Sequence, residues 1–365
     1  MKYIELGKIL EYEQPTKYLV ETTNYSNDYN IPVLTAGQTF ILGYTNETKN
    51  VFPIDRLPVI IFDDFTTASK FVDFPFKVKS TAMKILNPID GINIKYVFYA
   101  MQKIKFDNTL HKRYWISQYA NIKIPLPEIK KQNKIVEELD SITEIISCKK
   151  QQIKILDNLI KSQFVEMFEN EKRYVNLEEV CIFINGDRGK NYPSADKISK
   201  DSKGVPFINA GLLTNNTVDW ENMNYISEET YNKLGSGKIQ KDDILYCLRG
   251  SLGKHAIIDF DDKGAIASSL VILRADQNKI QSKFLLIQLG MDEIIRQQNL
   301  ANNGSSQPNL SASSVKKYRI KLPDIEMQNK FVNIVKQIDK QKFEIERSLK
   351  QMEELHNSLM VQYFG

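Results

Sequence analysis

The stretch that decides the fold occurs twice, as LPEIKKQNKIV at residues 126–136 and as LPDIEMQNKFV at residues 322–332. The two copies keep register to their ends, where SQFVEMF at 162–168 matches SLMVQYF at 358–364. A weaker similarity opens each half of the chain, with YIEL at 3–6 and YVNL at 174–177. A repeat of this long period indicates one structural unit used twice, a variable globular segment followed by a helix.

Both repeated stretches are predicted to be long helices with coiled-coil spacing, because their apolar residues follow a 4-3 alternation. Each stretch follows a proline, Pro127 or Pro323, which suits the start of a helix. Polar residues interrupt the apolar stripes at Lys149, Lys342 and His356. The residues expected to pair the helices are Ile135, Leu139, Ile142, Ile146, Ile153, Leu156, Ile160, Phe331, Val335, Ile338, Ile345, Leu349, Met352 and Leu359.

Two amphipathic stripes in one chain can bury each other as an intramolecular antiparallel coiled coil, or each can pack on its own domain as a core helix. The repeat and the heptad length favour mutual pairing. A helix of about 35–40 residues spans roughly 50–60 Å and could hold two domains apart as a rigid spacer. Because the two copies are sequential repeats, their pairing would give approximate two-fold symmetry.

The segments between the helices carry short runs of β-branched and aromatic residues, broken by Gly, Asn, Asp and Pro, which predict strands. The clearest runs are LPVIIF at 57–62, KVK at 77–79, DILYC at 243–247 and LVIL at 270–273. The expected fold class is therefore α+β, with two strand-rich domains separated by two long helices. The expected boundaries are 1–125 for the first domain, 126–170 for the central helix, 171–321 for the second domain and 322–365 for the C-terminal helix.

Composition sets broad limits on the class of protein. With 42% hydrophobic and 26% charged residues, the sequence is typical of a globular protein, and no apolar run is long enough for a transmembrane helix. The N-terminus lacks the apolar stretch of a signal peptide, and three widely separated cysteines do not make a disulfide framework. We therefore expect a cytoplasmic protein. The net charge of +4 is compatible with a nucleic-acid partner but does not establish one.

Several motifs resemble the specificity subunit of type I restriction–modification enzymes, and the resemblance covers essentially the whole chain. Its most specific parts are the paired helix openings at 126–136 and 322–332. Further matching stretches in the second half are VPFINAG at 205–211, LRGSLGK at 248–254, GSSQPNLS at 304–311 and YRIKLP at 318–323. The first half looks like a different recognition module, with IPVLTAG at 31–37 and FDDFTT at 62–67. It lacks a clear GxxQPNLS loop, and the nearest stretch is DNTLHKRY at 107–114.

The resemblance implies two target-recognition domains, each reading one half of a bipartite, asymmetric site in double-stranded DNA. It also implies that the helices set the unread gap and dock two methyltransferase subunits. Motor and endonuclease subunits would complete the assembly. S-adenosylmethionine, ATP and magnesium are then expected in the partner subunits, with no cofactor in this chain and no membrane partner. An alternative of another class is a structural coiled-coil adaptor with two protein-binding domains and no DNA readout.

Reading DNA requires donors and acceptors that reach base edges, together with cations for phosphate. Polar loop residues are the natural candidates, although each could equally be a solvated or turn-forming residue. The candidates in the first domain are Thr35, Gln38, Tyr44, Thr66, Thr67, Lys70, Lys112, Arg113 and Tyr114. Those in the second are Arg188, Lys190, Asn191, Tyr192, Arg249, Ser251, Lys254, Gln307 and Asn309. Asp63 and Asp64 could accept a hydrogen bond from cytosine but are more often turn-forming.

The sequence gives no support for catalysis in this chain. GSGK at 235–238 ends like a phosphate-binding loop, but Asn232 replaces its leading glycine and Ile239 replaces the residue that binds magnesium. The three histidines have no metal-ligand spacing, and the Asp/Asn-Pro-Pro-aromatic tetrapeptide of adenine methyltransferases does not occur. We therefore expect no catalytic residues and no metal site.

Overall fold

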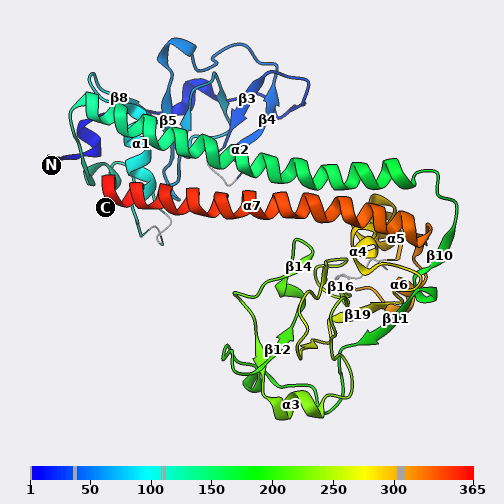
Figure 1. The fold of residues 1–365 in the computed structure, drawn as a ribbon. Helices are drawn as coiled ribbons and strands as arrows, with labels where there is room; N and C mark the ends of the chain where they lie inside the picture. The colour runs from blue at the N-terminus through cyan, green and yellow to red at the C-terminus, as the bar shows by residue number, and fades with distance from the viewer. Residues whose placement is uncertain (1, 36–38, 108, 110–111, 302–308) are drawn as a thin grey trace. The chain divides into compact units, whose positions relative to one another are not determined.

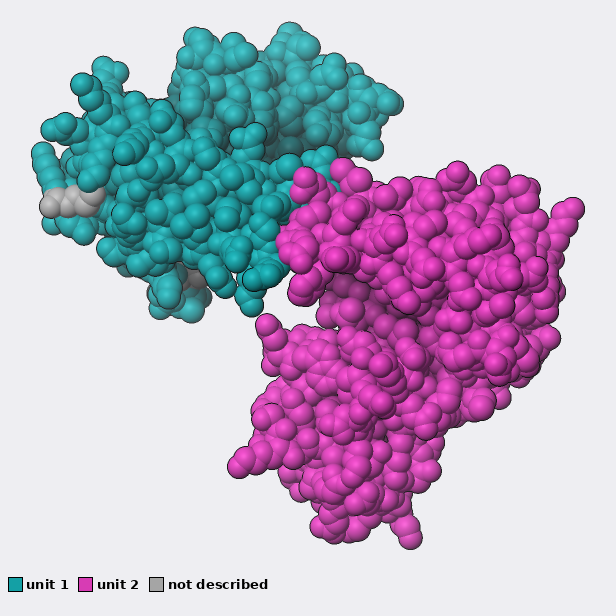
Figure 2. All heavy atoms as spheres, in the orientation of Figure 1, with its two compact units in different colours: residues 1–151, 346–365 teal, residues 152–345 magenta. Residues whose placement is uncertain are grey.

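The computed structural model describes residues 2–35, 39–107, 109, 112–301 and 309–365 (Figure 1). The chain divides into two compact units, residues 1–151 with 346–365, and residues 152–345 (Figure 2). Two 40-residue helices, α2 (Ile129–Phe168) and α7 (Ile325–Phe364), each contribute to both units. Strand-rich domains combined with two long helices confirm the predicted α+β class.

The described part of the first unit contains a four-stranded sheet, a three-stranded sheet, a two-stranded sheet and the helix α1 (Ile94–Lys103). A four-stranded antiparallel sheet has the order β2 (Leu10–Glu13), β8 (Met83–Pro88), β5 (Val59–Asp63) and β6 (Ser69–Val72). A three-stranded sheet has the order β4 (Ile41–Thr45), β3 (Ile31–Leu34) and β7 (Lys77–Val78). Strand β1 (Tyr3–Glu5) pairs with β9 (Lys123–Pro125), which leads into α2. Within the second sheet β3 and β7 are parallel.

The second unit repeats this plan with additions. Its four-stranded sheet has the order β11 (Cys181–Asn185), β19 (Leu270–Ala275), β16 (Ile244–Cys247) and β17 (His255–Ile257). Its three-stranded sheet has the order β15 (Tyr225–Ile226), β12 (Val205–Ile208) and β18 (Ala265–Ile266), with β12 and β18 parallel. Strand β10 (Tyr174–Asn176) pairs with β20 (Arg319–Lys321), and β13 (Leu213–Thr214) pairs with β14 (Thr217–Val218). The helices are α3 (Glu228–Lys233), α4 (Ser282–Leu289), α5 (Asp292–Ala301) and α6 (Ala312–Lys316).

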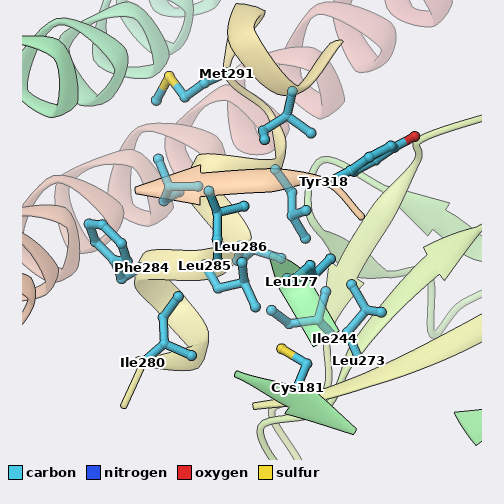
Figure 3. Close-up of a cluster of buried hydrophobic side chains, with 14 of the residues drawn as sticks. Leu177, Cys181, Ile244, Leu273, Ile280, Phe284, Leu285, Leu286, Met291 and Tyr318 are labelled. Atoms are coloured by element: carbon cyan, nitrogen blue, oxygen red, sulfur yellow. The ribbon is translucent and has the colours of Figure 1, made fainter. Parts of the chain in front are cut away.

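The apolar runs of the sheet supply the core of the second unit, shown in Figure 3. Ile244 and Leu273 from neighbouring strands are fully buried, together with Leu177, and α4 adds Phe284 and Leu285. Removing a side chain of this size from water contributes about 1.5–3 kcal/mol. This core holds the sheet rigid, so that loops at its ends start from fixed positions.

The repeated glutamine of the helix openings has a structural role in both units. Gln132 accepts a hydrogen bond at Oε1 from the backbone N–H of Asn93 (3.0 Å), the residue that caps α1. Gln328 accepts in the same way from the N–H of Gln281 (2.9 Å), which precedes α4. Both amides are buried and also donate to the carbonyl of the nearby proline, Pro127 or Pro323. The motif therefore attaches each long helix to the domain that precedes it.

The far end of each long helix packs on the other domain. In the second unit Phe168, at the end of α2, lies 5.2 Å from Phe284 of α4, measured between ring centroids. In the first unit Phe364, at the end of α7, lies 5.1 Å from Tyr96 of α1. Each domain core thus contains the beginning of one long helix and the end of the other.

Within each unit α2 and α7 lie side by side and antiparallel (Figure 1). Lys150 pairs with Glu353 in the first unit, and Lys342 pairs with Asp157 at 2.7 Å in the second. Lys342, a polar interruption of the predicted stripe, is therefore neutralised by the facing helix. All fourteen residues expected to pair the helices are buried or half-buried, those nearest the domains most deeply. Several apolar residues outside the stripes are exposed, among them Ile145, Ile155, Leu159, Phe343, Leu355 and Val361.

Candidate nucleic-acid interface

Three polar loops of the second domain meet at one end of its four-stranded sheet. Strand β16 ends there, β19 begins there and β11 ends there, as their antiparallel registers require. The backbone N–H of Leu248 donates to the carbonyl of Ser269 (2.9 Å), and Arg188 Nη2 donates to the carbonyl of Ser268 (3.2 Å). The turn before β19 is therefore hydrogen-bonded to both the Arg188 loop and the loop that follows β16.

The loop between β16 and β17 is a tight, fixed turn. The N–H of Cys247 donates to the carbonyl of Lys254 (2.8 Å), and the N–H of Gly253 donates to the carbonyl of Cys247 (3.2 Å). Gly253 has a φ of 73°, and a Cβ there would lie 1.8 Å from Oε1 of Gln298, so only glycine fits. The side chains of Arg249, Ser251 and Lys254 are exposed on this turn. All three predicted residues of this loop are thus presented to solvent on a rigid support.

The Arg188 loop is fastened by an aspartate at its base. Asp187 accepts hydrogen bonds from the N–H groups of Gly189 and Gly235, both at 2.7 Å, and these bonds lower the pKa of its carboxyl. The GSGK stretch is consequently the turn that docks against this loop. Arg188, Lys190 and Asn191 are exposed, and the latter two line a polar pocket with Lys197 and Lys233. Tyr192 lines the same pocket but is half-buried against Phe207.

The first domain joins its corresponding loops by the same backbone bonds. The N–H of Asp64 donates to the carbonyl of Ala82 (3.1 Å), and the N–H of Tyr114 donates to the carbonyl of Asp64 (2.9 Å). In the second domain Leu248 occupies the equivalent place, bonded to Ser269 and to the N–H of Leu310 (2.9 Å). Aligned on their helix openings, the two repeats bring residue 114 onto residue 310. Tyr114 and Leu310 are therefore bonded to their domains at the same point.

Both aspartates of the first-domain loop are structural. Asp64 is 2% exposed as a side chain, pairs with the buried Lys84 at 3.4 Å, and accepts a hydrogen bond from the N–H of Trp115 (2.9 Å). Asp63 accepts hydrogen bonds from the N–H of Phe65 (2.9 Å) and from the hydroxyl of Thr66 (2.6 Å). These bonds form the turn, so neither carboxylate is presented to a base.

The remaining first-domain candidates differ in how far their side chains are exposed to solvent. Thr66, Lys70 and Arg113 are exposed, and Thr35, Thr67 and Lys112 are half-buried. Tyr44 is half-buried within strand β4 rather than in a loop. Tyr114 is only 1% exposed and packs edge-on against Phe106, so its side chain belongs to the domain interior. The predictions at Gln38 and Gln307 fall outside the described residues.

Two residue roles were not predicted from the sequence. Phe65 lies beneath the guanidinium of Arg113, whose Cζ is 6.0 Å from the ring centroid. Gln298 of α5 contacts the Gly253 turn and accepts a hydrogen bond from the hydroxyl of Tyr246. Alignment of the two repeats brings Arg113 onto Asn309 of the GSSQPNLS loop. This alignment was the sequence signal that could have pointed to Arg113 and so to Phe65 beside it.

Neither metal-binding nor membrane-spanning features occur in the described part of the chain. No group of three or more His, Cys, Asp and Glu side chains there could hold a metal ion. Across the same residues, no helix combines the length and the apolar character needed to span a bilayer.

Comparisons with known proteins bear on the family. The model of the type I restriction modification DNA specificity domain matches residues 169–355. The chain is 33% identical over 368 residues to the EcoR124I/EcoR124II type I restriction enzyme specificity subunit of Escherichia coli, covering 93% of this chain and 87% of that relative. It is 21% identical over 330 residues to the MjaVIII specificity subunit of Methanocaldococcus jannaschii, covering 80% and 76% respectively.

Solved structures show the same fold. The crystal structure of a type I restriction–modification S subunit from M. genitalium matches with a TM-score of 0.65 at 15% identity, covering 100% of this chain and 96% of that one. A chain from a structure describing assembly and conformational transition of a type I restriction–modification system matches with a TM-score of 0.54 at 16% identity, covering 99% and 97%. Together with the fold and the loops at the sheet ends, the family model and the E. coli relative establish that this chain belongs to the DNA specificity subunits of type I restriction–modification systems.

Proposed function

We propose that each domain reads one half of a bipartite, asymmetric sequence in double-stranded DNA. In this proposal residues 1–125 and 171–321 are the reading domains, and residues 126–170 and 322–365 set the spacing between the half-sites. One observation carries the proposal. Each domain fixes polar loops to the end of its central sheet through equivalent backbone bonds, but the loops differ in sequence. Two different readers on one repeated frame suit an asymmetric DNA site.

The polar residues predicted on these loops, apart from the tyrosines, are the proposed contacts. Cations would bind phosphate, while arginine, asparagine and hydroxyl groups would reach base edges. The proposed second-domain residues are Arg188, Lys190, Asn191, Arg249, Ser251, Lys254, Gln307 and Asn309. The proposed first-domain residues are Thr35, Gln38, Thr66, Thr67, Lys70, Lys112 and Arg113. Three tyrosines are left out: the buried Tyr114, Tyr44 within strand β4, and Tyr192, whose ring packs against Phe207.

Catalysis is proposed to lie in partner chains. Two methyltransferase subunits would dock on α2 and α7 and bind S-adenosylmethionine, and motor–endonuclease subunits would use ATP and magnesium. The exposed apolar residues of the long helices, such as Ile155 and Phe343, are suitable for contact with another protein. The assembly would act in the cytoplasm, on the DNA present there.

Co-expression with the cognate methyltransferase subunit, followed by mapping of N6-methyladenine, tests this function. A stable complex should methylate one interrupted, two-part sequence. An Arg249→Ala variant should relax or abolish recognition in one half only, because Arg249 lies on the second domain. Arg173→Ala is the matched control, since this exposed arginine precedes β10 and pairs weakly with Asp324 at 4.0 Å. A stable complex that methylates no defined sequence would favour the adaptor alternative.

A further inference from the structure

In each domain, two loops at the end of the central four-stranded sheet bring one pair of residues opposite each other. In the second domain Arg249 and Asn309 lie directly opposite each other, as an antiparallel bridge held by the bond from Leu310 N–H to the Leu248 carbonyl. In the first domain the equivalent bond, from Tyr114 N–H to the Asp64 carbonyl, brings Phe65 opposite Arg113. The cross-loop pairs are therefore Phe65 with Arg113, and Arg249 with Asn309.

Each cross-loop pair contains one arginine, but on opposite loops. In the first domain the arginine is on the loop that precedes α2, and the hairpin supplies an aromatic ring 6.0 Å from its guanidinium carbon. In the second domain the arginine is on the hairpin, and the loop that precedes α7 supplies an asparagine. A guanidinium thus starts from one member of the same cross-loop pair in both domains, although from opposite loops.

In the part of the chain that the structure describes, some arginines are engaged by carboxylates and others, including Arg188, Arg113 and Arg249, are not. Arg56, Arg173 and Arg274 lie within 4.0 Å of a carboxylate. Among the residues that the structure describes, neither Arg113 nor Arg249 forms such an ion pair, and both are exposed. Next to Phe65, Asp63 and Asp64 are already engaged by the turn and by Lys84. Asp243, just before the strand that leads to Arg249, is engaged by Arg274. Both cations are therefore available to a ligand.

We propose that Arg113 and Arg249 are base-reading residues, each supplied by the cross-loop pair of its domain and each taking the major-groove edge of a guanine in its half-site. This inference rests on the proposed function and identifies two side chains that would recognise bases. Arginine is the usual partner of guanine because its two parallel N–H groups match O6 and N7. Phe65 is a positioning residue, since stacking on an aromatic face restricts the guanidinium before DNA binds.

The experiment uses the complex with the methyltransferase subunit and the DNA site found by methylation mapping. Affinity is measured for that site and for duplexes that carry one substituted base pair at each position. The wild-type complex should discriminate about 5- to 150-fold against loss of one guanine in each half. Arg113→Ala should remove discrimination at one position of the first half alone, and Arg249→Ala at one position of the second half alone.

Phe65 is tested with two substitutions of different chemistry. Phe65→Leu keeps an apolar side chain but removes the aromatic face, and should reduce discrimination about 2- to 5-fold at the position that Arg113 reads. Phe65→Tyr keeps the face and should restore it. Phe65→Leu added to Arg113→Ala should cause no further change at that position. Equal losses in the Leu and Tyr variants would show a general packing role and overturn the positioning role.

The outcomes separate this inference from the proposed function. If the wild-type complex selects a bipartite site but Arg113→Ala weakens binding to all duplexes equally, Arg113 binds phosphate and the inference is wrong while the function stands. If both arginine variants keep full discrimination at every position, the inference is likewise wrong. If the wild-type complex prefers no sequence, the proposed function itself fails.

Discussion

The two domains share a backbone frame and differ in the way they stabilise it. Each has a parallel strand pair in its three-stranded sheet, β3 with β7 and β12 with β18. The N–H of Lys79 donates to the Leu34 carbonyl in the first domain, and the N–H of Ala267 donates to the Ile208 carbonyl in the second. This shared geometry accounts for the similarity of IPVLTAG and VPFINAG. It also shows that the frame depends on backbone groups, which leaves side chains at the sheet ends free to diverge.

The stabilising side chains are different. The first domain buries two lysines, pairing Lys84 with Asp64 and Lys77 with Glu47. The second relies on tight glycine turns and on one aspartate, Asp243, which binds Arg274 through two contacts of 2.8 Å. Buried charges require their partners, since removing one partner leaves the other uncompensated. We therefore expect the two domains to respond differently to the same perturbation.

The largest expected effect comes from the phenylalanines at the helix ends. Phe168→Ala should destabilise the second domain by about 3–5 kcal/mol, because the ring is buried between Phe284 and Phe331. Phe364→Ala should destabilise the first domain by a smaller amount, about 2 kcal/mol, because this ring is only half-buried. Hydrogen exchange resolved by segment would report each domain separately.

Val165 and Val361 provide matched controls for the phenylalanine variants. They lie near the same helix ends and are each 54% exposed, so Val165→Ala and Val361→Ala should change stability little. If Phe364→Ala reduced hydrogen-exchange protection in the second domain and left the first domain unchanged, the packing of the α7 end on the first domain would be contradicted.

The repeated glutamines should give the next largest effect. Gln328→Ala leaves the Gln281 N–H and the carbonyls of Lys279 and Pro323 without their partner, which should cost about 2–4 kcal/mol in the second domain. Gln132→Ala should cost about 1–3 kcal/mol in the first domain, where the side chain makes two such bonds. Urea unfolding measures both changes. Asn329→Ala, at an exposed position of the same motif, is the control, and an equal loss there would refute this interpretation.

Acid should affect the Glu47–Lys77 pair of the first domain. Partial burial alone would raise the pKa of the Glu47 carboxyl, but hydrogen bonds from Lys77 and from the N–H groups of Glu21 and Thr22 lower it to about 2. Because the folded pKa lies below the unfolded value of about 4.3, the stabilisation is present at neutral pH and disappears as pH falls from about 4.3 toward 2.

The Glu47→Gln variant isolates this contribution. At pH 7 the wild type should exceed the variant in stability by about 2–3 kcal/mol, and the difference should shrink steadily below pH 4. Unfolding of the first domain is measured for both proteins at each pH. A difference that stayed constant between pH 7 and pH 3 would show that the carboxylate charge contributes nothing.

The smallest expected effect concerns phosphate contact by the second domain. Lys254→Gln should weaken binding a few-fold at every DNA sequence and reduce the slope of log affinity against log salt by about 1. Titration of the assembled complex at several salt concentrations measures this slope. Lys150→Gln removes an exposed lysine that pairs with Glu353 on the long helices, and should leave the slope unchanged. A change of base preference in Lys254→Gln would instead assign this lysine to readout.

Long periodic segments were predictable from the sequence, and short ones were not. The prolines at 127 and 323 placed the long helices, which begin at Ile129 and Ile325. The runs at 57–62, 77–79, 243–247 and 270–273 correspond to β5, β7, β16 and β19. Strands of two residues, such as β13 and β18, carry no periodicity and form only because distant partners align them. The shorter helices α1 and α3 to α6 were not predicted either.

The polar loops could be located by composition, but individual side chains could not be sorted. Tyr114 and Arg113 are adjacent and equally suited to DNA, yet one is buried against Phe106 and the other is exposed. That difference depends on a backbone bond to Asp64, fifty residues earlier in the chain. Burial set by long-range pairing is not visible in local sequence, so loop membership alone overestimates the interface.

The end of each long helix packs on the other domain, and this arrangement also sets the order in which the chain can fold during synthesis. The second unit ends at residue 345, so all of its parts have been synthesised while α7 is still being made. The first unit needs residues 346–365, including Phe364, to complete a core whose strands were made first. The earliest-made domain is therefore the last to be finished. A ribosome that stops within α7 releases a chain with one mature domain and one incomplete domain, which exposes apolar surface that cellular proteases can recognise.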